Sequence, residues 1–261
     1  MNNILLNISN IFPKNVTVVF IHAHADDESF LSAGTINYLQ KNGRKCILIY
    51  AAAEEVEGQK KTLIRKKEIA SVSTILNIHK IFYLPFCEPQ YQGSNALPFI
   101  NQETETVLSE LDKIITDNKI QTPFVLVSYD KNGGYGNKDH VLLHKVGREY
   151  IEKNRNKVLN FLEVTLNRNR ILDWINDSKD RLGTESLPQL SYWSKEFGLS
   201  ESEISFFYEL NKIELEKKYE CFKTHKSQIH TNEFPASLSM NDFEQVFGRE
   251  YYKIYKSDSS I

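Results

Sequence analysis

The stretch that decides the fold is VTVVFIHAHADDES, residues 16–29. Its first half, Val16–Phe20, is β-branched and aromatic without charge, which predicts a buried strand of a parallel sheet. Its second half places His24 beside the three consecutive carboxylates of Asp26–Glu28. Carboxylates at the mouth of a core repel one another and are costly to bury, and a bound cation removes that cost.

A histidine and a carboxylate from one tight turn are typical ligands of a divalent metal, most often zinc. A second acidic residue beside the ligand can act as a base on water that the metal activates. The same residues also suit an ordinary helix start, because Asp and Glu interact favourably with the positive end of the helix dipole. The metal site is therefore a hypothesis that requires a second group of ligands elsewhere in the chain.

Length and composition are those of an ordinary globular protein. The 261 residues allow one large domain or two small ones. The composition is 41% hydrophobic and 25% charged, which is typical of the globular class. With 32 basic and 34 acidic residues the net charge is −2, so we expect no nucleic-acid partner.

The three cysteines, Cys46, Cys87 and Cys221, are far apart and form no C-x-x-C pair. This spacing argues against a disulfide framework and against a cysteine zinc site, and a reducing, cytoplasmic location is the simplest interpretation. Residues 1–12 lack a basic region and a long apolar run, so we expect no signal peptide. No run of about 18 apolar residues occurs, so we expect no membrane span. A homo-oligomer is compatible with the sequence.

Strand and helix patterns alternate through residues 1–153. The predicted strands are Val16–Ala23, Lys45–Ala52, Lys80–Leu84 and Pro123–Tyr129, and the predicted helices are Ser29–Asn42, Lys60–Asn77, Glu103–Asn118 and Asp139–Lys153. This order predicts a Rossmann-like α/β fold, a mostly parallel sheet with right-handed crossovers and helices on both faces. In the common order 3-2-1-4 the first and fourth strands are neighbours, and ligands bind beyond their carboxyl ends. The acidic turn should therefore face the loop DKNGGYGNKDH, residues 130–140.

The remaining residues, 154–261, are predicted to form a C-terminal extension that caps the site, within a single domain of residues 1–261. We expect a strand near Phe161–Leu166 and a helix near Ile171. Ser200–Glu203 has the S-x-x-E pattern of a capping box. The stretch Ile204–His225 that follows is predicted to be helical, with at most a short break in its middle.

The loop at residues 130–140 supplies the second group of candidate ligands. Its glycines at 133, 134 and 136 let the backbone turn sharply and approach a ligand closely. His140 begins the next helix and is the natural third ligand. His144 lies one turn on and can share a metal at that spacing, but a packed helix histidine is the more common outcome. A His-Asp-His set leaves a position open for water and substrate, which is typical of catalytic zinc and predicts a hydrolase.

The main rival among enzymes is a Rossmann-type nucleotide-binding protein. Such a protein needs a glycine-rich turn directly after the first strand, so that the pyrophosphate meets backbone N–H groups. Here the first strand is followed by carboxylates, which repel a pyrophosphate. The glycine-rich loop also lacks the spacing and the following Lys-Ser/Thr of a phosphate loop.

These motifs resemble those of the LmbE-like/PIG-L deacetylases, zinc-dependent enzymes that remove an acetyl group from N-acetylglucosaminyl compounds. Residues 23–28 are A-H-A-D-D-E where that family has A-H-P-D-D-E, and residues 136–140 are G-N-K-D-H where it has G-H-P-D-H. The resemblance includes the Arg65-x-x-Glu68 spacing, FGLSESEI at 197–204 and HKSQ at 225–228. It covers most of the chain and is weakest over residues 154–195.

The resemblance implies three groups of site residues. The implied zinc ligands are His24, Asp27 and His140. The implied catalytic residues are Asp26 as general base, together with Tyr135, Asn137 and Asp139. The implied substrate contacts are Arg65, to the sugar, and Tyr135, which polarises the carbonyl or stabilises the oxyanion. The implied activity is removal of an N-acetyl group from a conjugate of an N-acetylglucosamine-type sugar.

Other side chains have a less specific interpretation. Glu28 is expected behind the metal ligands. Arg65 is almost as well explained by a helix-surface ion pair with Glu68. His225 either supports the site from the C-terminal helix or packs in the core, and His22 is better explained as a satisfied core histidine.

Two residues depart from the motifs of the family. Ala25 stands where proline is usual, which removes a backbone constraint but no ligand. Asn137 stands where a histidine is usual, and it can donate a hydrogen bond but cannot carry a proton at neutral pH. Loss of such an acid or donor typically lowers a rate on the order of a hundredfold. The sequence therefore also allows a metal-binding pseudoenzyme or a sugar-binding protein with little turnover.

Overall fold

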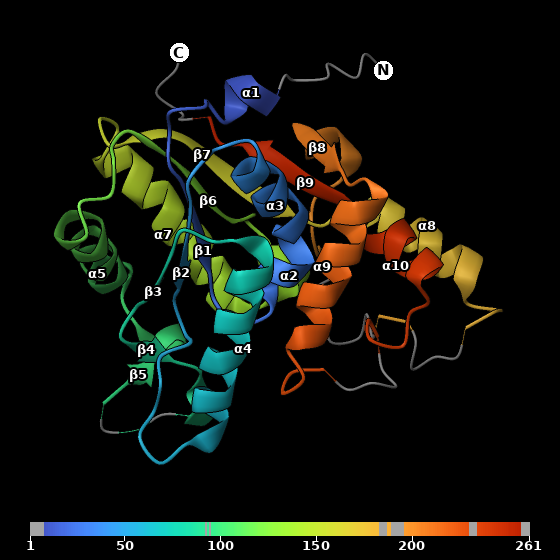
Figure 1. Ribbon diagram of the computed structural model, residues 1–261, viewed down its shortest axis with the longest axis horizontal. Helices are drawn as coiled ribbons and strands as arrows, with labels where there is room; N and C mark the ends of the chain where they lie inside the picture. The colour runs from blue at the N-terminus through green and yellow to red at the C-terminus, as the bar shows by residue number, and fades with distance from the viewer. Residues whose placement is uncertain are drawn as a thin grey trace.

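The computed structural model describes residues 8–91, 93, 95–182, 187–188, 196–229 and 234–256. Over these residues the main sheet has seven strands in the order β3-β2-β1-β6-β7-β9-β8 (Figure 1). The strands of this sheet are β1 Val18–His22, β2 Cys46–Tyr50, β3 Lys80–Tyr83, β6 Phe124–Tyr129, β7 Val158–Thr165, β8 Phe206–Glu209 and β9 Arg249–Ile254. A separate parallel pair consists of β4 Phe86–Cys87 and β5 Leu97–Pro98.

Five neighbouring strands of the main sheet, from β3 to β7, pair in parallel, and β9 is antiparallel to both β7 and β8. The predicted order 3-2-1-4 is confirmed, because β1 lies between β2 and β6. The carboxyl ends of β1 and β6 therefore meet at the point where the strand order reverses. The mostly parallel α/β fold predicted from the alternating pattern is confirmed.

Helices cover both faces of the sheet. Their bounds are α1 Ile8–Ile11, α2 Asp27–Leu31, α3 Ala33–Lys41, α4 Lys60–Leu76, α5 Thr104–Asp117, α6 Gly133–Gly136, α7 Lys138–Lys153, α8 Arg168–Ser178, α9 Lys212–Thr224 and α10 Met240–Phe247. Figure 1 shows α5 and α7 on one side of the strands and α3, α4 and α9 on the other. From β1 the chain first builds the sheet toward β3 and later, from β6, toward β7. Because crossovers between parallel strands are right-handed, the helices of these two halves lie on opposite faces.

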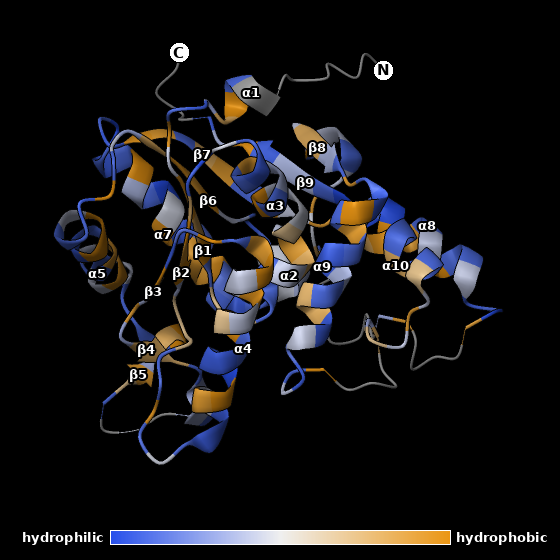
Figure 2. Cartoon of the chain, viewed as in Figure 1, coloured by the Kyte–Doolittle hydropathy of each residue, from blue (hydrophilic) through white to orange (hydrophobic). Residues whose placement is uncertain are grey.

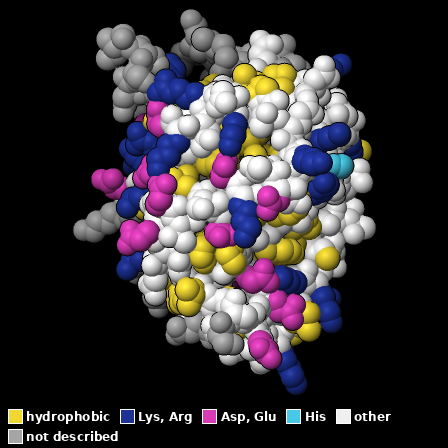
Figure 3. Space-filling view, turned by 90° about the vertical axis from the view of Figure 1, so that its left-hand side faces the viewer, with side chains coloured by type: hydrophobic (Ala, Val, Ile, Leu, Met, Phe, Trp, Pro, Cys, Tyr) yellow, Lys and Arg dark blue, Asp and Glu magenta, His cyan; other side chains and the backbone are white. Residues whose placement is uncertain are grey.

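The core lies between the sheet and these helices. The strands β1, β2 and β6 are buried at every position, as expected for central parallel strands covered on both faces. In Figure 2 they form the hydrophobic centre, and the helices turn polar residues outward. Basic and acidic side chains are mixed on the face shown in Figure 3, in keeping with the net charge of −2.

The helix predicted over Ser29–Asn42 is two helices, α2 and α3, which are interrupted at Ser32. Two buried polar contacts form at this break. The Ser32 hydroxyl lies 2.8 Å from Nε2 of His22, and the Glu250 carboxylate accepts the backbone N–H groups of Gly34 and Thr35 at 2.8 and 2.7 Å. A carboxylate at the start of α3 satisfies donors that have no partner within the helix.

The continuous helix predicted over Ile204–His225 is wrong in its first part. Phe206–Glu209 forms β8, and α9 begins only at Lys212 behind a second capping box, Asn211 with Glu214. The capping box at Ser200 exists, but it starts a short 3-10 turn over Glu201–Glu203. The aromatic residues of β8 pair with β9, about 45 residues later in the chain, and this distant partner leaves no trace in the local pattern.

Residues after 153 contribute three strands, β7, β8 and β9, to the same sheet, and α9 packs on α3 and α4. The single domain with a division at residue 153 stays a prediction. Parts of the stretch 154–195 and the tail 257–261 lie outside the described residues.

Among the helices that the structure describes, none combines the length and the apolar character that crossing a membrane requires.

Candidate active site

Two loops bring the predicted site residues together. β1 ends at His22, and the turn after it carries His24 and leads into α2. β6 ends at Tyr129, and the glycine-rich turn after it leads to His140 in the first turn of α7. The predicted meeting of the acidic turn and the glycine-rich loop is therefore observed.

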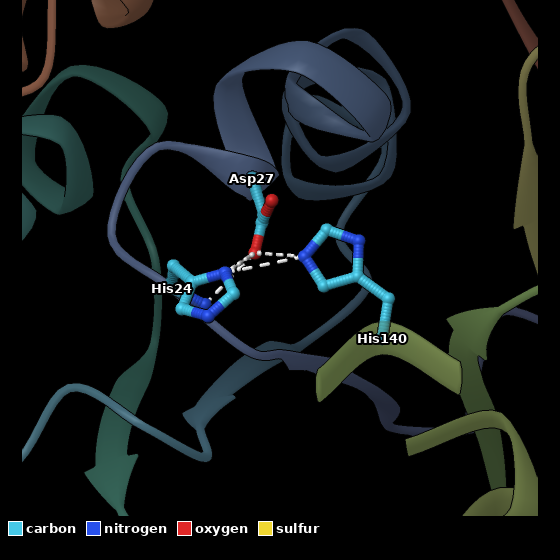
Figure 4. Close-up of side chains that lie close together, drawn as sticks. All are labelled: His24, Asp27 and His140. Atoms are coloured by element: carbon cyan, nitrogen blue, oxygen red, sulfur yellow. Dashed lines mark hydrogen bonds and ion pairs between the residues drawn. The ribbon is translucent and has the colours of Figure 1, made fainter. Parts of the chain in front are cut away.

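His24, Asp27 and His140 form a compact, buried triangle (Figure 4). Oδ2 of Asp27 lies 3.4 Å from Nδ1 of His24 and 3.2 Å from Nε2 of His140, and the two ring nitrogens are 3.2 Å apart. Among the described residues, these three are the group of His, Cys, Asp or Glu side chains whose ligand atoms lie close enough together to hold a metal ion.

The outer nitrogen of each imidazole has its own acceptor. Nε2 of His24 lies 2.9 Å from Oδ2 of Asp139, and Nδ1 of His140 lies 3.1 Å from the carbonyl oxygen of Gly133. When those nitrogens carry the protons, the lone pairs of Nδ1 in His24 and Nε2 in His140 point toward the centre of the triangle. Metal-binding histidines use such outer hydrogen bonds to fix their tautomer and orientation.

The triangle fits a zinc-sized cation. Bonds of about 2.0–2.1 Å at tetrahedral angles place neighbouring donor atoms roughly 3.3–3.4 Å apart, and the three observed separations are 3.2, 3.2 and 3.4 Å. The donor set of two imidazoles and one carboxylate also suits zinc and leaves a fourth position for water or substrate. The residues present therefore fit the metal that the motif predicts.

Asp26 has an unusual backbone. Its φ of 108° is in the left-handed region, which non-glycine residues seldom adopt. The Asp26 backbone N–H donates to Glu28 at 3.2 Å, and its carbonyl accepts from the Ser29 N–H at 2.9 Å, so the neighbouring turn holds this conformation in place. Burial, with the charge of Asp27, raises the pKa of Asp26 to about 8. Strained backbone of this kind is concentrated at functional sites, and here it occurs at the residue that precedes Asp27, one of the candidate metal ligands.

Glu28 lies beside the triangle of candidate metal ligands, in a network with no solvent exposure. Its carboxylate is 2.6 Å from Nε2 of His225 and accepts from the hydroxyls of Ser29 at 2.7 Å and Tyr50 at 2.9 Å. Burial acts against ionisation, but His225 lowers the pKa of Glu28 to about 2. His225 follows α9, so this pair joins the C-terminal extension to the acidic turn.

Tyr129 is a site residue that the sequence analysis missed. Its hydroxyl donates to Oδ2 of Asp27 at 2.6 Å and accepts the backbone N–H of Ala23 at 2.8 Å. Its ring also stacks on His140 with the centroids 3.9 Å apart. The available signal was its place as the last residue of the fourth strand, at the switch point of the sheet.

Asn137 has a structural role in the loop opposite. Its side-chain oxygen accepts the backbone N–H of Asp139 at 2.8 Å, so Asn137 is the N-cap of α7. Its side chain is also hydrogen-bonded to the Tyr135 hydroxyl. Burial raises the pKa of Tyr135 well above its usual range, so the phenol keeps its proton at neutral pH.

Glycine is required at position 133 in the same loop. Gly133 has a φ of 60°, and a Cβ there would lie 2.9 Å from the Cβ of His140 and from the backbone nitrogen of Val141. Any other residue would push His140 away from the triangle. The sharp turn predicted for this loop thus requires glycine at one definite position.

Arg65 is buried on α4 and pairs with Glu88, beside the site, instead of pairing with Glu68. The helix-surface pair considered for Arg65 and Glu68 is therefore wrong. Glu68 accepts the backbone N–H and the hydroxyl of Ser227 at 2.8 and 2.6 Å. These contacts attach the segment after α9 to α4.

His144 and His22 make structural contacts. Nδ1 of His144 lies 3.1 Å from the carbonyl oxygen of Tyr129, and burial lowers its pKa to about 4. His144 is therefore a packed helix histidine that does not point at the triangle. His22 is buried in β1 and bonded to Ser32, as predicted for a core histidine.

Two cavities open on this site. One has a volume of about 510 Å³ and is mainly polar, and its wall includes Arg65, Glu88 and Asn137. The other has a volume of about 250 Å³ and is mainly apolar. Asp26 and Tyr135 line both cavities, so a ligand that spans them lies over the catalytic candidates.

This chain is similar in sequence and in fold to several deacetylases. The 1D-myo-inositol 2-acetamido-2-deoxy-alpha-D-glucopyranoside deacetylase of Acidothermus cellulolyticus is 23% identical over 265 residues, which covers 90% of this chain and 87% of that protein. Among solved structures, the N,N'-diacetylchitobiose deacetylase from Pyrococcus horikoshii aligns with a TM-score of 0.61 at 18% identity, covering 96% of this chain and 87% of that one. A teicoplanin deacetylase in a zinc-inhibited form aligns with a TM-score of 0.64 at 11% identity, covering 94% of this chain and 100% of that one.

A family model described as GlcNAc-PI de-N-acetylase, PIG-L, matches residues 19–151, more than half of the chain. That range begins in β1 and ends in α7, so it contains both loops of the site. The resemblance drawn from the motifs is thus confirmed by an independent match, and the chain belongs to the PIG-L family.

Proposed function

We propose that this protein is a zinc-dependent N-deacetylase, an amide hydrolase that acts on an N-acetylglucosamine-type sugar conjugate. The observation that carries the proposal is the buried triangle of His24, Asp27 and His140 with a second carboxylate, Asp26, at the junction of two cavities. Membership of the PIG-L family and the deacetylase activity named for the relative from Acidothermus cellulolyticus support the same reaction.

The proposed reaction is hydrolysis of an acetamide. A water oxygen forms a bond to the carbonyl carbon while Asp26 accepts one proton of that water. The C–N bond then breaks, and Asp26 returns the proton to the leaving nitrogen, so the products are acetate and the amino sugar. A divalent cation, when bound, supplies a Lewis acid that activates water and polarises the carbonyl.

Other side chains orient the reacting groups. The Tyr135 phenol is a donor for the oxygen that gains charge as the carbonyl carbon becomes tetrahedral. We propose that Asp139 acts through His24, because its carboxylate accepts the Nε2 hydrogen of that ring. The pair of Arg65 and Glu88 on the wall of the polar cavity is placed to contact sugar hydroxyls.

Metal analysis combined with an acetate-release assay on a panel of N-acetylglucosamine conjugates tests the proposal. We expect about one zinc per chain and release of acetate from at least one conjugate. Asp26→Ala should abolish turnover with zinc still bound. Loss of zinc in that variant would show that base and ligand have been exchanged.

Two other outcomes would overturn the proposal. Zinc bound without any release of acetate would favour the metal-binding pseudoenzyme, in which Asn137 fails to replace the usual histidine. Absence of zinc would remove the basis for a metal hydrolase. Our proposal of a reducing, cytoplasmic location is compatible with the three cysteines, which are free and buried.

A further inference from the structure

The apolar cavity is the feature that the proposed reaction on an acetyl group does not explain. Removal of an acetyl group requires space for one methyl beside the carbonyl. The cavity has a volume of about 250 Å³ and reaches Asp26 and Asp27, two residues of the reacting centre. A dry cavity of roughly 150 Å³ is already large enough for benzene. The space beside the reacting centre therefore exceeds what acetyl uses.

The walls of this cavity are suited to hydrocarbon. Phe30 comes from α2, Ile171 from α8, and Val246 and Phe247 from α10. Ile171, Val246 and Phe247 belong to a hydrophobic cluster that is separate from the main core, and Phe30 packs against this cluster. A sugar ring placed here would lose water from its hydroxyls and find few hydrogen-bond partners, which is unfavourable.

The polar cavity offers what a sugar needs. Arg65, Glu88, Asn137 and Asp139 line it, and they supply both donors and acceptors. The two cavities share Asp26, Tyr135 and Gln228, so their junction lies where the amide is cut. An amide group at this junction carries the sugar on its nitrogen and the acyl chain on its carbonyl carbon. The sugar on the nitrogen side suits the polar cavity, and the acyl group on the carbon side then enters the apolar one.

We propose that the preferred substrate is an N-acyl amino sugar whose acyl group is larger than acetyl and occupies the cavity lined by Phe30, Ile171, Val246 and Phe247. This inference rests on the proposed N-deacylation. The bonds made and broken are unchanged: water adds to the carbonyl carbon, the C–N bond breaks, and the products are a longer carboxylate and the free amine. An apolar aglycone is a weaker candidate, because it is attached to the sugar and leaves from the polar cavity.

A series of N-acyl glucosamines tests the proposal with the zinc-loaded protein. The probes are the N-acetyl, N-butanoyl, N-hexanoyl and N-octanoyl compounds, with octyl N-acetylglucosaminide as the probe for an apolar aglycone. Because each buried methylene contributes about 0.8 kcal/mol, kcat/KM should rise about fourfold per methylene until the cavity is filled. Amine release, measured by the same assay for every probe, gives the ratio of hexanoyl to acetyl activity.

Two substitutions at one wall position should shift the preferred acyl length in opposite directions. Val246→Phe fills the cavity and should lower the ratio of hexanoyl to acetyl activity at least tenfold, whereas Val246→Ala enlarges it and should shift the optimum to a longer chain. Leu172→Phe is the matched control, because Leu172 is exposed on α8 beside Ile171 and outside the cavity wall, and it should leave the ratio unchanged. The opposite signs separate a cavity effect from a general loss of stability.

The results distinguish this inference from the function beneath it. If the N-acetyl compound is hydrolysed best and longer chains are slower, the acyl proposal is overturned and the deacetylase proposal stands. If the octyl glycoside gains activity and the longer acyl chains do not, the cavity holds an aglycone and the acyl proposal is also overturned. If the zinc-loaded protein hydrolyses none of the amides, the proposed function itself fails.

Discussion

The hydrogen bond between Asp139 and His24 gives the sharpest test of how the site is organised. Asp139→Asn keeps the size of the side chain and removes the negative charge that faces Nε2 of His24 at 2.9 Å. Burial lowers the pKa of His24, but the hydrogen bonds to Asp139 and Asp27 raise it to about 10. A less basic imidazole is a weaker metal ligand, so we expect Asp139→Asn to weaken zinc binding.

The size of the effect follows from the role of such contacts. Residues that orient a metal ligand typically change metal affinity by about 10–100-fold. Because the 2.9 Å contact joins two buried side chains, we expect a loss of about thirtyfold in zinc affinity, or on the order of 2 kcal/mol.

Competition with a chromophoric chelator measures this dissociation constant for the wild type and the variant. Asp173→Asn is the matched control, since Asp173 is an exposed aspartate on α8, away from the site. The reasoning fails if Asp139→Asn leaves zinc affinity within twofold of wild type but lowers kcat more than a hundredfold. Asp139 would then act on the reacting atoms, as the motif alone implied, and not through His24.

Three further predictions concern other residues. Asn137→His should raise the deacetylase rate on the order of a hundredfold, because it restores an acid. The same change removes the N-cap of α7 and should lower the free energy of unfolding by about 1 kcal/mol. A deacetylase rate that is unchanged or lower contradicts the prediction about the acid. His225→Leu leaves Glu28 buried without its partner, so urea unfolding of the metal-free protein should show a loss of about 3 kcal/mol, and a loss under 1 kcal/mol would contradict the importance of the pair. Arg181 lowers the pKa of Asp242 to about 2, so this pair stabilises the fold above pH 4 and the stabilisation disappears toward pH 2. Because the Arg181 side chain is half exposed, Asp242→Asn should cost about 1 kcal/mol at pH 6 and progressively less below pH 4, and a difference independent of pH would refute this assignment.

Much of the fold could be predicted because its signals are local. Central strands such as β2 and β6 are continuous apolar runs, and helices such as α5 repeat apolar residues at helical spacing. The strand order then follows from a rule about parallel sheets, and this order alone places His24 opposite His140. The PIG-L family was likewise readable from two short motifs.

The features that could not be predicted depend on distant partners. β8 forms because its aromatic residues meet β9, whereas the local pattern of Ile204–His225 is equally consistent with a helix. Tyr129 reaches Asp27 across 102 residues, and His225 reaches Glu28 across 197. The alternative of an Arg65–Glu68 pair was wrong for the same reason, since Glu68 is a neighbour on the helix and Glu88 comes from a loop.

The position of β9 has a consequence for how the chain is made. β9 lies between β7 and β8, so β7 keeps an unpaired edge until residues 249–254 emerge, more than 80 residues after β7 itself. Glu250 of this strand also supplies the carboxylate that joins the start of α3 to Lys218 of α9. During synthesis the nascent chain therefore exposes an open sheet edge for several seconds, at about 5–20 residues per second. An edge of this kind is a template for pairing with another chain, so the unfinished chain is more open to such pairing than the finished one.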